Sequence, residues 1–147
     1  KKLNLMKSPI PTIVFIIACY LLMIPASRAE QFVQWQGFDI HYNTFSSLLI
    51  PPDVAKAHGI SRSKNSIITN ISIVQNGIPT KAQVTGQSLN LLGQLTQLAF
   101  IEVNERTGIY YLANQIVDEK DTLRFSLRIK PSGSEETYDL NYNRQYY

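Results

Sequence analysis

An unbroken alternation of apolar and polar residues near the C-terminus places the strongest constraint on the fold. Over residues 122–130, apolar side chains occupy every second position, and Thr, Ser, Arg or Lys residues lie between them. A period of two residues is typical of a β-strand that buries one face and exposes the other. The segment therefore predicts a half-buried strand at the edge of a hydrophobic core.

Six further segments have the composition of short strands separated by turn residues. They are residues 38–42, 67–73, 82–84, 95–103, 109–117 and 138–142. The segment 95–103 is apolar on both faces in its middle, which predicts one continuous strand at the centre of a packed layer. About seven strands without a sustained helical period predict an all-β fold, and the commonest such architecture is an immunoglobulin-like antiparallel β-sandwich.

The last two strands are expected to pair as a hairpin. Pairing Leu127 with Tyr138 keeps apolar residues opposite apolar residues along both strands, and the same register sets Asp121 opposite Arg144. A slip of one residue would oppose apolar and polar positions throughout, so the register of this hairpin should be strongly fixed.

One segment has helical features instead. Pro51 and Pro52 precede a short Ala-containing stretch, and Gly59 follows it. Proline is favoured at the start of a helix and glycine just past its end. We expect one helix of about two turns here, between two strands.

The N-terminus has the features of an export signal. Lys1, Lys2 and Lys7 precede an apolar stretch over residues 13–24, and small residues flank Arg28 in Ser27-Arg28-Ala29. This pattern predicts cleavage after Ala29, which divides the chain into a signal peptide, 1–29, and a single domain, 30–147.

Two alternatives to cleavage after Ala29 remain open. Residues 16–19 resemble a bacterial lipobox, which would place a lipid on Cys19. The second alternative is that the apolar stretch stays uncleaved as an anchor, although it is shorter than the roughly 20 residues that a membrane-spanning helix needs. Cleavage would leave no integral membrane segment and predicts a periplasmic location.

The charge distribution argues against a nucleic-acid partner. Four of the 14 basic residues and none of the 11 acidic residues lie within 1–29. The predicted mature domain therefore carries slightly more acidic than basic residues. Electrostatic binding of nucleic acid requires an excess of basic residues, so we expect no such partner.

The predicted mature domain offers little for metal binding or catalysis. Cys19 and both methionines fall within 1–29, which leaves His41 and His58 as the only soft or imidazole ligands. We expect His41 on the polar face of a strand and His58 in the last turn of the helix. No Gly-x-Ser-x-Gly motif is present, and the acidic residues cluster at predicted turns. The sequence predicts no metal site, no cofactor and no enzymatic activity.

Two loops are candidate contact sites. The first carries Arg62, Lys64 and Asn65, and is either a solvated connection or a contact for an anionic group or a partner protein. The second carries Leu91 and Leu92, which either insert into the end of the sandwich or remain exposed for a partner.

The C-terminal tyrosines leave a similar choice. Tyr146 and Tyr147 lie past the predicted core face of the last strand. They either cap the sandwich or contact a partner, because aromatic residues suit both cores and interfaces.

Three stretches of the chain resemble a known family. They are residues 30–32 with 38–42, residues 57–65 running into 70–72, and Asn90 to Gln94. They are similar to a family of small exported proteins of gamma-proteobacteria, the domain of unknown function number 4426, over essentially all of residues 30–147. The resemblance implies a periplasmic or envelope location and brings no activity and no catalytic residues.

These observations favour a non-catalytic interaction or assembly module whose partner is an envelope protein. The alternative is a ligand-binding or hydrolytic domain that acts on an envelope component, with its site near Arg62 and Lys64.

Overall fold

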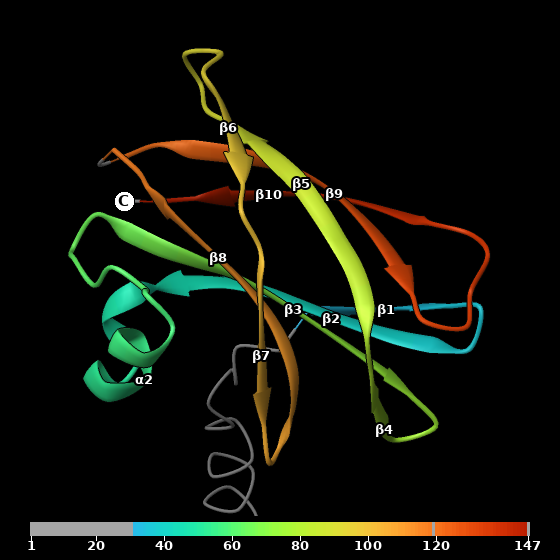
Figure 1. The fold of residues 1–147 in the computed structure, drawn as a ribbon. Coiled ribbons are helices and arrows are strands. Elements are labelled where there is room, and N and C mark those ends of the chain that lie inside the picture. The colour runs from blue at the N-terminus through green and yellow to red at the C-terminus, as the bar shows by residue number, and fades with distance from the viewer. Residues whose placement is uncertain (1–30, 119, 147) are drawn as a thin grey trace, which may run out of the picture.

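The computed structural model describes residues 31–118 and 120–146, which form two antiparallel β-sheets packed face to face (Figure 1). The predicted all-β sandwich is confirmed. Sheet 1 has the order β1-β2-β3-β8-β7, and β4 extends it by pairing with β3; sheet 2 has the order β10-β9-β5-β6. The strands of sheet 1 are β1 (Gln31–Trp35), β2 (Phe38–Ser46), β3 (Ser66–Gln75), β4 (Ile78–Thr80), β7 (Ile101–Glu105) and β8 (Gly108–Ile116). Those of sheet 2 are β5 (Ala82–Leu89), β6 (Leu95–Leu98), β9 (Thr122–Pro131) and β10 (Tyr138–Gln145).

Each of the seven predicted strands corresponds to one or two strands of the structure, and β1 and β4 are additional. Both additional strands belong to hairpins with two-residue turns. The turn residues Gln36 and Gly37 have φ angles of 49° and 80°, and Asn76 and Gly77 have 51° and 77°. Two consecutive positive φ angles match the twist of a tight hairpin. The Asn76-Gly77 turn thus leads from β3 into the short additional strand β4.

The prediction of one continuous strand over residues 95–103 was wrong. The chain passes from β6 in sheet 2 to β7 in sheet 1, and Ala99 and Phe100 lie between the two. Leu98 is buried and Phe100 packs against the same core. The segment is apolar on both sides because it crosses between the sheets, not because it lies at the centre of one.

The predicted register of the last hairpin was wrong by two residues, although its facing was correct. Tyr138 pairs with Ile129 instead of Leu127, and Arg144 pairs with Leu123 instead of Asp121. A shift of two residues keeps every side chain on its face. β9 is paired with β5 as far as its own last residue, Pro131, and the next residue continues this contact, since the Ser132 N–H donates to the Lys81 carbonyl at 2.7 Å. β9 therefore extends further into the connection between β9 and β10 than the predicted register allows.

The main core lies between the sheets and draws on both of them. Its buried residues are Phe38, Ile40, Ile67, Ile71, Ile73, Leu98, Tyr111, Ala113, Val117, Leu123, Phe125, Leu127, Ile129 and Leu140. The alternating residues of β9 supply four of these, as the sequence pattern predicted.

A smaller core lies on the outer face of sheet 1, under the helix α2 (Pro52–Ala57). Ala55 and Ile60 pack there against Ile68 and Leu112. The helix ends as predicted: Gly59 has a φ of 67°, and the Ile60 N–H donates to the Ala55 carbonyl at 2.8 Å. This hydrogen bond, with its apolar contact, is that of a Schellman motif. A short 3-10 turn, η1 (Ser47–Leu49), precedes the helix.

Residues 1–30 lie outside the described part of the chain, so the predicted signal peptide and Cys19 are not covered by the structure. Within the described residues, no helix has the length and apolar character that would be needed to cross a bilayer.

Candidate functional site

Both candidate loops lie at the same end of the sandwich, and the segment after β8 joins them. The Val117 N–H donates to the Asn65 carbonyl at 2.8 Å, and the Leu91 N–H donates to a carboxylate oxygen of Asp121 at 3.3 Å. The Tyr146 N–H donates to the Asp121 carbonyl at 2.8 Å. We call this region, with residues 61–65, 90–94, 117–118, 121 and 146, the loop end.

The turn between β5 and β6 is held by the side chain of Asn90. Its Oδ1 accepts hydrogen bonds from the N–H groups of Leu92, at 3.1 Å, and Gln94, at 2.8 Å, while its Nδ2 donates to the Gln94 side chain at 2.7 Å. Leu91 and Leu92 are 65% and 80% exposed on this turn, which projects beyond its neighbours (Figure 1). The structure thus places both leucines outward rather than in the core.

The loop that carries Arg62, Lys64 and Asn65 is fastened to η1. Ser47 is fully buried, and its hydroxyl accepts from the Ser63 N–H at 3.1 Å and donates to the Ser63 carbonyl at 3.2 Å. The Arg62 guanidinium donates to the Leu48 carbonyl at 3.0 Å. The Arg62 side chain therefore makes a hydrogen bond within the fold. Lys64 and Asn65 instead line a hollow at the surface.

Lys64 and Asn65 line a hollow of about 190 Å³ at the loop end, which we call the Lys64 hollow. Its other lining residues come from three further segments, namely Ser46, Ile67, Val117, Asp118 and Tyr146. No sequence pattern predicts that Asp118 or Tyr146 lies near Lys64, because residues this far apart in the chain meet only through the pairing of the strands.

A cluster of hydroxyl groups lies between the sheets next to this hollow. The hydroxyls of Thr44 and Tyr142 form a hydrogen bond of 3.0 Å. Burial raises the pKa of Tyr142 to about 12, and hydrogen bonding to Thr44 partly opposes the rise. Burial also raises the pKa of Tyr146, whose ring lines the hollow. Tyr146 therefore caps the sandwich, one of its two predicted roles.

A second, smaller hollow of about 90 Å³ lies on the other side of Val117 and Asp118. Its floor is polar: the Ser88 hydroxyl donates to the Gln115 side-chain carbonyl at 3.1 Å, and both side chains are buried. Asn90 and Asp121 also line it. Polar side chains that take part in hydrogen bonds therefore lie beneath the exposed turn with Leu91 and Leu92.

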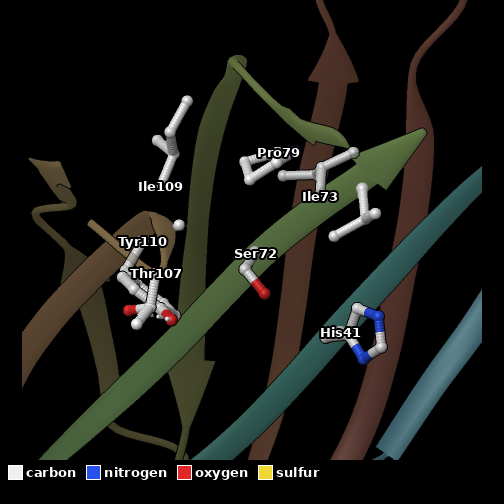
Figure 2. A pocket seen from close by; sticks show the side chains of 9 residues that line it. His41, Ser72, Ile73, Pro79, Thr107, Ile109 and Tyr110 are labelled. Carbon is white, nitrogen blue, oxygen red and sulfur yellow. Dashed lines mark hydrogen bonds between the residues drawn. The ribbon is translucent and has the colours of Figure 1, made fainter. Parts of the chain in front are cut away.

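His41 lies outside the loop end, on the outer face of sheet 1. It lines a hollow of about 180 Å³ together with Ser72, Thr107 and Tyr110 (Figure 2). The ring of His41 stacks on Phe32, with 5.5 Å between ring centroids. Its position on the non-core face of the strand is the predicted one.

His58 is the C-cap residue of α2, close to its predicted position and on an element that His41 does not share. Among residues 31–118 and 120–146, no three His, Cys, Asp or Glu side chains are grouped so that they could hold a metal ion.

Glu102, one of the acidic residues near predicted turns, has partners within the fold. It accepts hydrogen bonds from Asn104 and Tyr111 and forms an ion pair of 3.1 Å with Lys81. The hydrogen bonds from Asn104 and Lys81 lower the pKa of Glu102. This carboxylate therefore joins neighbouring strands.

Comparison with known proteins identifies relatives in sequence and fold. No functionally curated protein matches the chain. A crystal structure of a DUF4426 family protein from Pseudomonas aeruginosa is 32% identical, with a TM-score of 0.75 over 82% of this chain and 97% of that one.

Two structures of FetP from the uropathogenic Escherichia coli strain F11 share the fold. A copper-bound variant is 16% identical, with a TM-score of 0.57 over 80% of this chain and 95% of that one. The protein as isolated, expressed recombinantly in the periplasm, is 14% identical, with a TM-score of 0.58 over 80% and 93%. At these identities the likeness concerns the fold alone.

The sequence also matches a family model across nearly all the described residues. The model is that of DUF4426, a domain of unknown function, and it covers residues 32–147. The resemblance found in the sequence is thereby confirmed, and the chain belongs to the DUF4426 family.

Proposed function

We propose that residues 30–147 form a non-catalytic interaction module that is exported to the periplasm behind a cleavable signal peptide, residues 1–29. The features of an export signal in the sequence support this location. The sandwich fold shared with FetP, a protein that was expressed in the periplasm, is compatible with it. The family has no assigned activity.

The projecting turn with Leu91 and Leu92 is the observation that carries the proposal. The side chains of Leu91 and Leu92 are 65% and 80% exposed. Each Å² of apolar surface that stays in water costs about 25 cal/mol of free energy relative to burial. Here the leucines are held out by an ordered turn, since Asp121 accepts a hydrogen bond from the Leu91 N–H, and Asn90 accepts hydrogen bonds from the next two anchored N–H groups, those of Leu92 and Gln94. A prearranged apolar tip loses little conformational entropy when it enters a groove of a partner. The module binds an envelope protein through this tip.

Photocrosslinking in living cells tests this proposal. A photoreactive amino acid at position 92 should crosslink one defined envelope protein. The same amino acid at position 78 is the matched control, because Ile78 is 67% exposed on the β3–β4 hairpin, outside the loop end. The crosslink at 92 should be competed by unlabelled protein but not by a Leu91→Ser, Leu92→Ser variant. Equal crosslinking from both positions would contradict the proposal.

A second candidate function is the binding of a small ligand, and the Lys64 hollow is the observation that favours it. Ligand sites are concave, largely apolar and carry a few polar groups that orient the ligand. The hollow combines the apolar residues Ile67 and Val117 with Lys64, Asn65 and Asp118 at its rim. This function is compatible with docking through the leucine tip, since the two features use different residues of the loop end.

A further inference from the structure

The Lys64 hollow carries opposite charges that do not neutralise each other. Lys64 and Asp118 both line it, and both are exposed. Within the described part of the chain, ion pairs join Lys81 to Glu102 and Arg128 to Asp139, and neither Lys64 nor Asp118 takes part in one. A ligand that reaches both side chains therefore does not have to break an ion pair first.

Asn65 adds a hydrogen-bond donor on the side of the cation. The Ser63 hydroxyl donates to Oδ1 of Asn65 at 2.9 Å. This contact leaves the amino group of the Asn65 side chain for another acceptor. An ammonium group and an amide N–H₂ on adjacent residues are suited to the two oxygens of a carboxylate.

The geometry of the rim is set by backbone hydrogen bonds. The Val117 N–H donates to the Asn65 carbonyl at 2.8 Å, so the segment with Asp118 is tied to the segment with Lys64. Ser63 is in turn fastened to the buried Ser47. Because both segments are anchored, the backbone at Lys64 and at Asp118 is held in a defined arrangement around the hollow.

The hollow also has apolar lining residues. Ile67 and Val117 are 4% and 9% exposed, and Tyr146 and Ser46 contribute to the lining as well. The hollow measures about 190 Å³, whereas a water molecule occupies roughly 30 Å³ of liquid. There is room for a small organic molecule with an apolar group.

We infer that the Lys64 hollow binds a small zwitterion of the α-amino acid type with an apolar side chain. Its carboxylate lies at Lys64 and Asn65, its ammonium group at Asp118, and its side chain on Ile67 and Val117. This inference rests on the second candidate function, ligand binding, and adds the chemical class of the ligand.

NMR titration of the domain with simple probes tests the inference. The probes are L-alanine, L-valine and L-leucine, together with isocaproate, which lacks the ammonium group, and leucinamide, which lacks the carboxylate. We expect at least one of the three amino acids to shift the amide resonances of Asn65 and Val117. For leucine, both truncated analogues should bind about tenfold more weakly or worse, since each loses one charge-assisted contact.

Variants that each remove one charge provide a second test of the inferred binding site. Lys64→Gln and Asp118→Asn should each weaken binding of the amino acid about tenfold. Lys56→Gln and Glu135→Gln are matched controls, because both residues are exposed and do not line the hollow, and they should leave binding unchanged. All four positions lie at the surface, so the variants should fold.

The outcomes separate the inference from the function on which it rests. If isocaproate or leucinamide binds as tightly as the amino acid, the assignment of a zwitterionic ligand is wrong, whereas the second candidate function, binding of a small ligand, still holds. If none of the probes shifts any resonance at millimolar concentration, both the inference and the second candidate function are overturned. Loss of binding in the control variants would also overturn the assignment to this hollow.

Discussion

The hydroxyl group of Tyr111 in sheet 1 accepts a hydrogen bond from the backbone N–H of Ala82 in sheet 2, with 2.7 Å between oxygen and nitrogen. The same hydroxyl donates to the Glu102 carboxylate at 3.2 Å. One side chain thus connects the first residue of β5 to both β8 and β7. Burial raises the pKa of Tyr111, so the group stays a neutral donor and acceptor.

Replacing this hydroxyl tests its contribution to the packing of the sheets. Tyr111→Phe leaves the Ala82 N–H without this partner and should lower the free energy of unfolding by about 1–3 kcal/mol. Tyr110→Phe is the control, since the Tyr110 hydroxyl is hydrogen-bonded to the exposed side chain of Thr107 at 3.2 Å. Urea denaturation measures both, and equal losses would contradict the role assigned to Tyr111.

A close approach of strands explains the glycine at position 86. A Cβ atom there would lie 2.7 Å from the Ser126 carbonyl oxygen and would overlap the Leu127 side chain. Gly86→Ala should therefore destabilise the domain by about 1–3 kcal/mol through overpacking. Gly108→Ala is a suitable comparison, because the nearest atom is the movable Tyr110 hydroxyl at 3.3 Å. Thermal unfolding that ranks the two variants the other way would refute this explanation.

The side chain of Asn90 should control the order of the leucine turn. Asn90→Ala removes the acceptor for the N–H groups of Leu92 and Gln94. Hydrogen exchange at these two amides should accelerate about fivefold or more, since capping contacts of this kind contribute about 1 kcal/mol or more. Exchange in the core strand β3 should change much less. Unchanged exchange at Leu92 would show that the turn is ordered by other contacts.

The buried tyrosines predict a loss of stability in strong alkali. The pKa of Tyr142 rises from 10.0 in its unperturbed state to about 12 in the fold. A raised pKa means that folding favours the protonated hydroxyl, so this contribution is complete below pH 10 and is lost as the pH rises towards 12. Unfolding followed by circular dichroism between pH 10 and 12 should show the loss. Tyr142→Phe should reduce the slope of stability against pH, and an unchanged slope would contradict the assignment.

The histidines should be dispensable. His41 lies on the outer face of sheet 1 and His58 caps α2. We expect the double change His41→Ala and His58→Ala to preserve cellular function, with at most a small loss of stability at His58. Elemental analysis of the purified protein should detect no stoichiometric transition metal. A tightly bound metal, or loss of function in a folded double variant, would argue against a non-catalytic module.

Local patterns in the sequence were sufficient for the fold class and for several elements. The alternation over 122–130 placed one face of β9 in the core, because the period of a strand is two residues whatever its partner. The Pro51-Pro52 and Gly59 signals located α2, because each acts through its own backbone geometry. The family was also evident from the residues alone.

Register and strand continuity depended on contacts between distant segments. Tyr138 faces Ile129 because β9 is paired with β5 as far as Pro131, a constraint that neither strand of the hairpin contains. The apolar run over 95–103 divides because the two sheets offer separate edges to it. Alternation specifies which face of a strand is buried, but not which residue lies opposite.

For the candidate site, too, the residue types could be recognised in the sequence, whereas their arrangement in space could not. Lys64, Asn65, Leu91 and Leu92 were recognisable from the sequence as loop residues with binding chemistry. Their gathering at one end, with Asp118 beside Lys64, was decided by the antiparallel pairing of β3 with β8 and of β5 with β9. Residue types and local propensity are properties of short segments, whereas a hollow exists only where several segments meet.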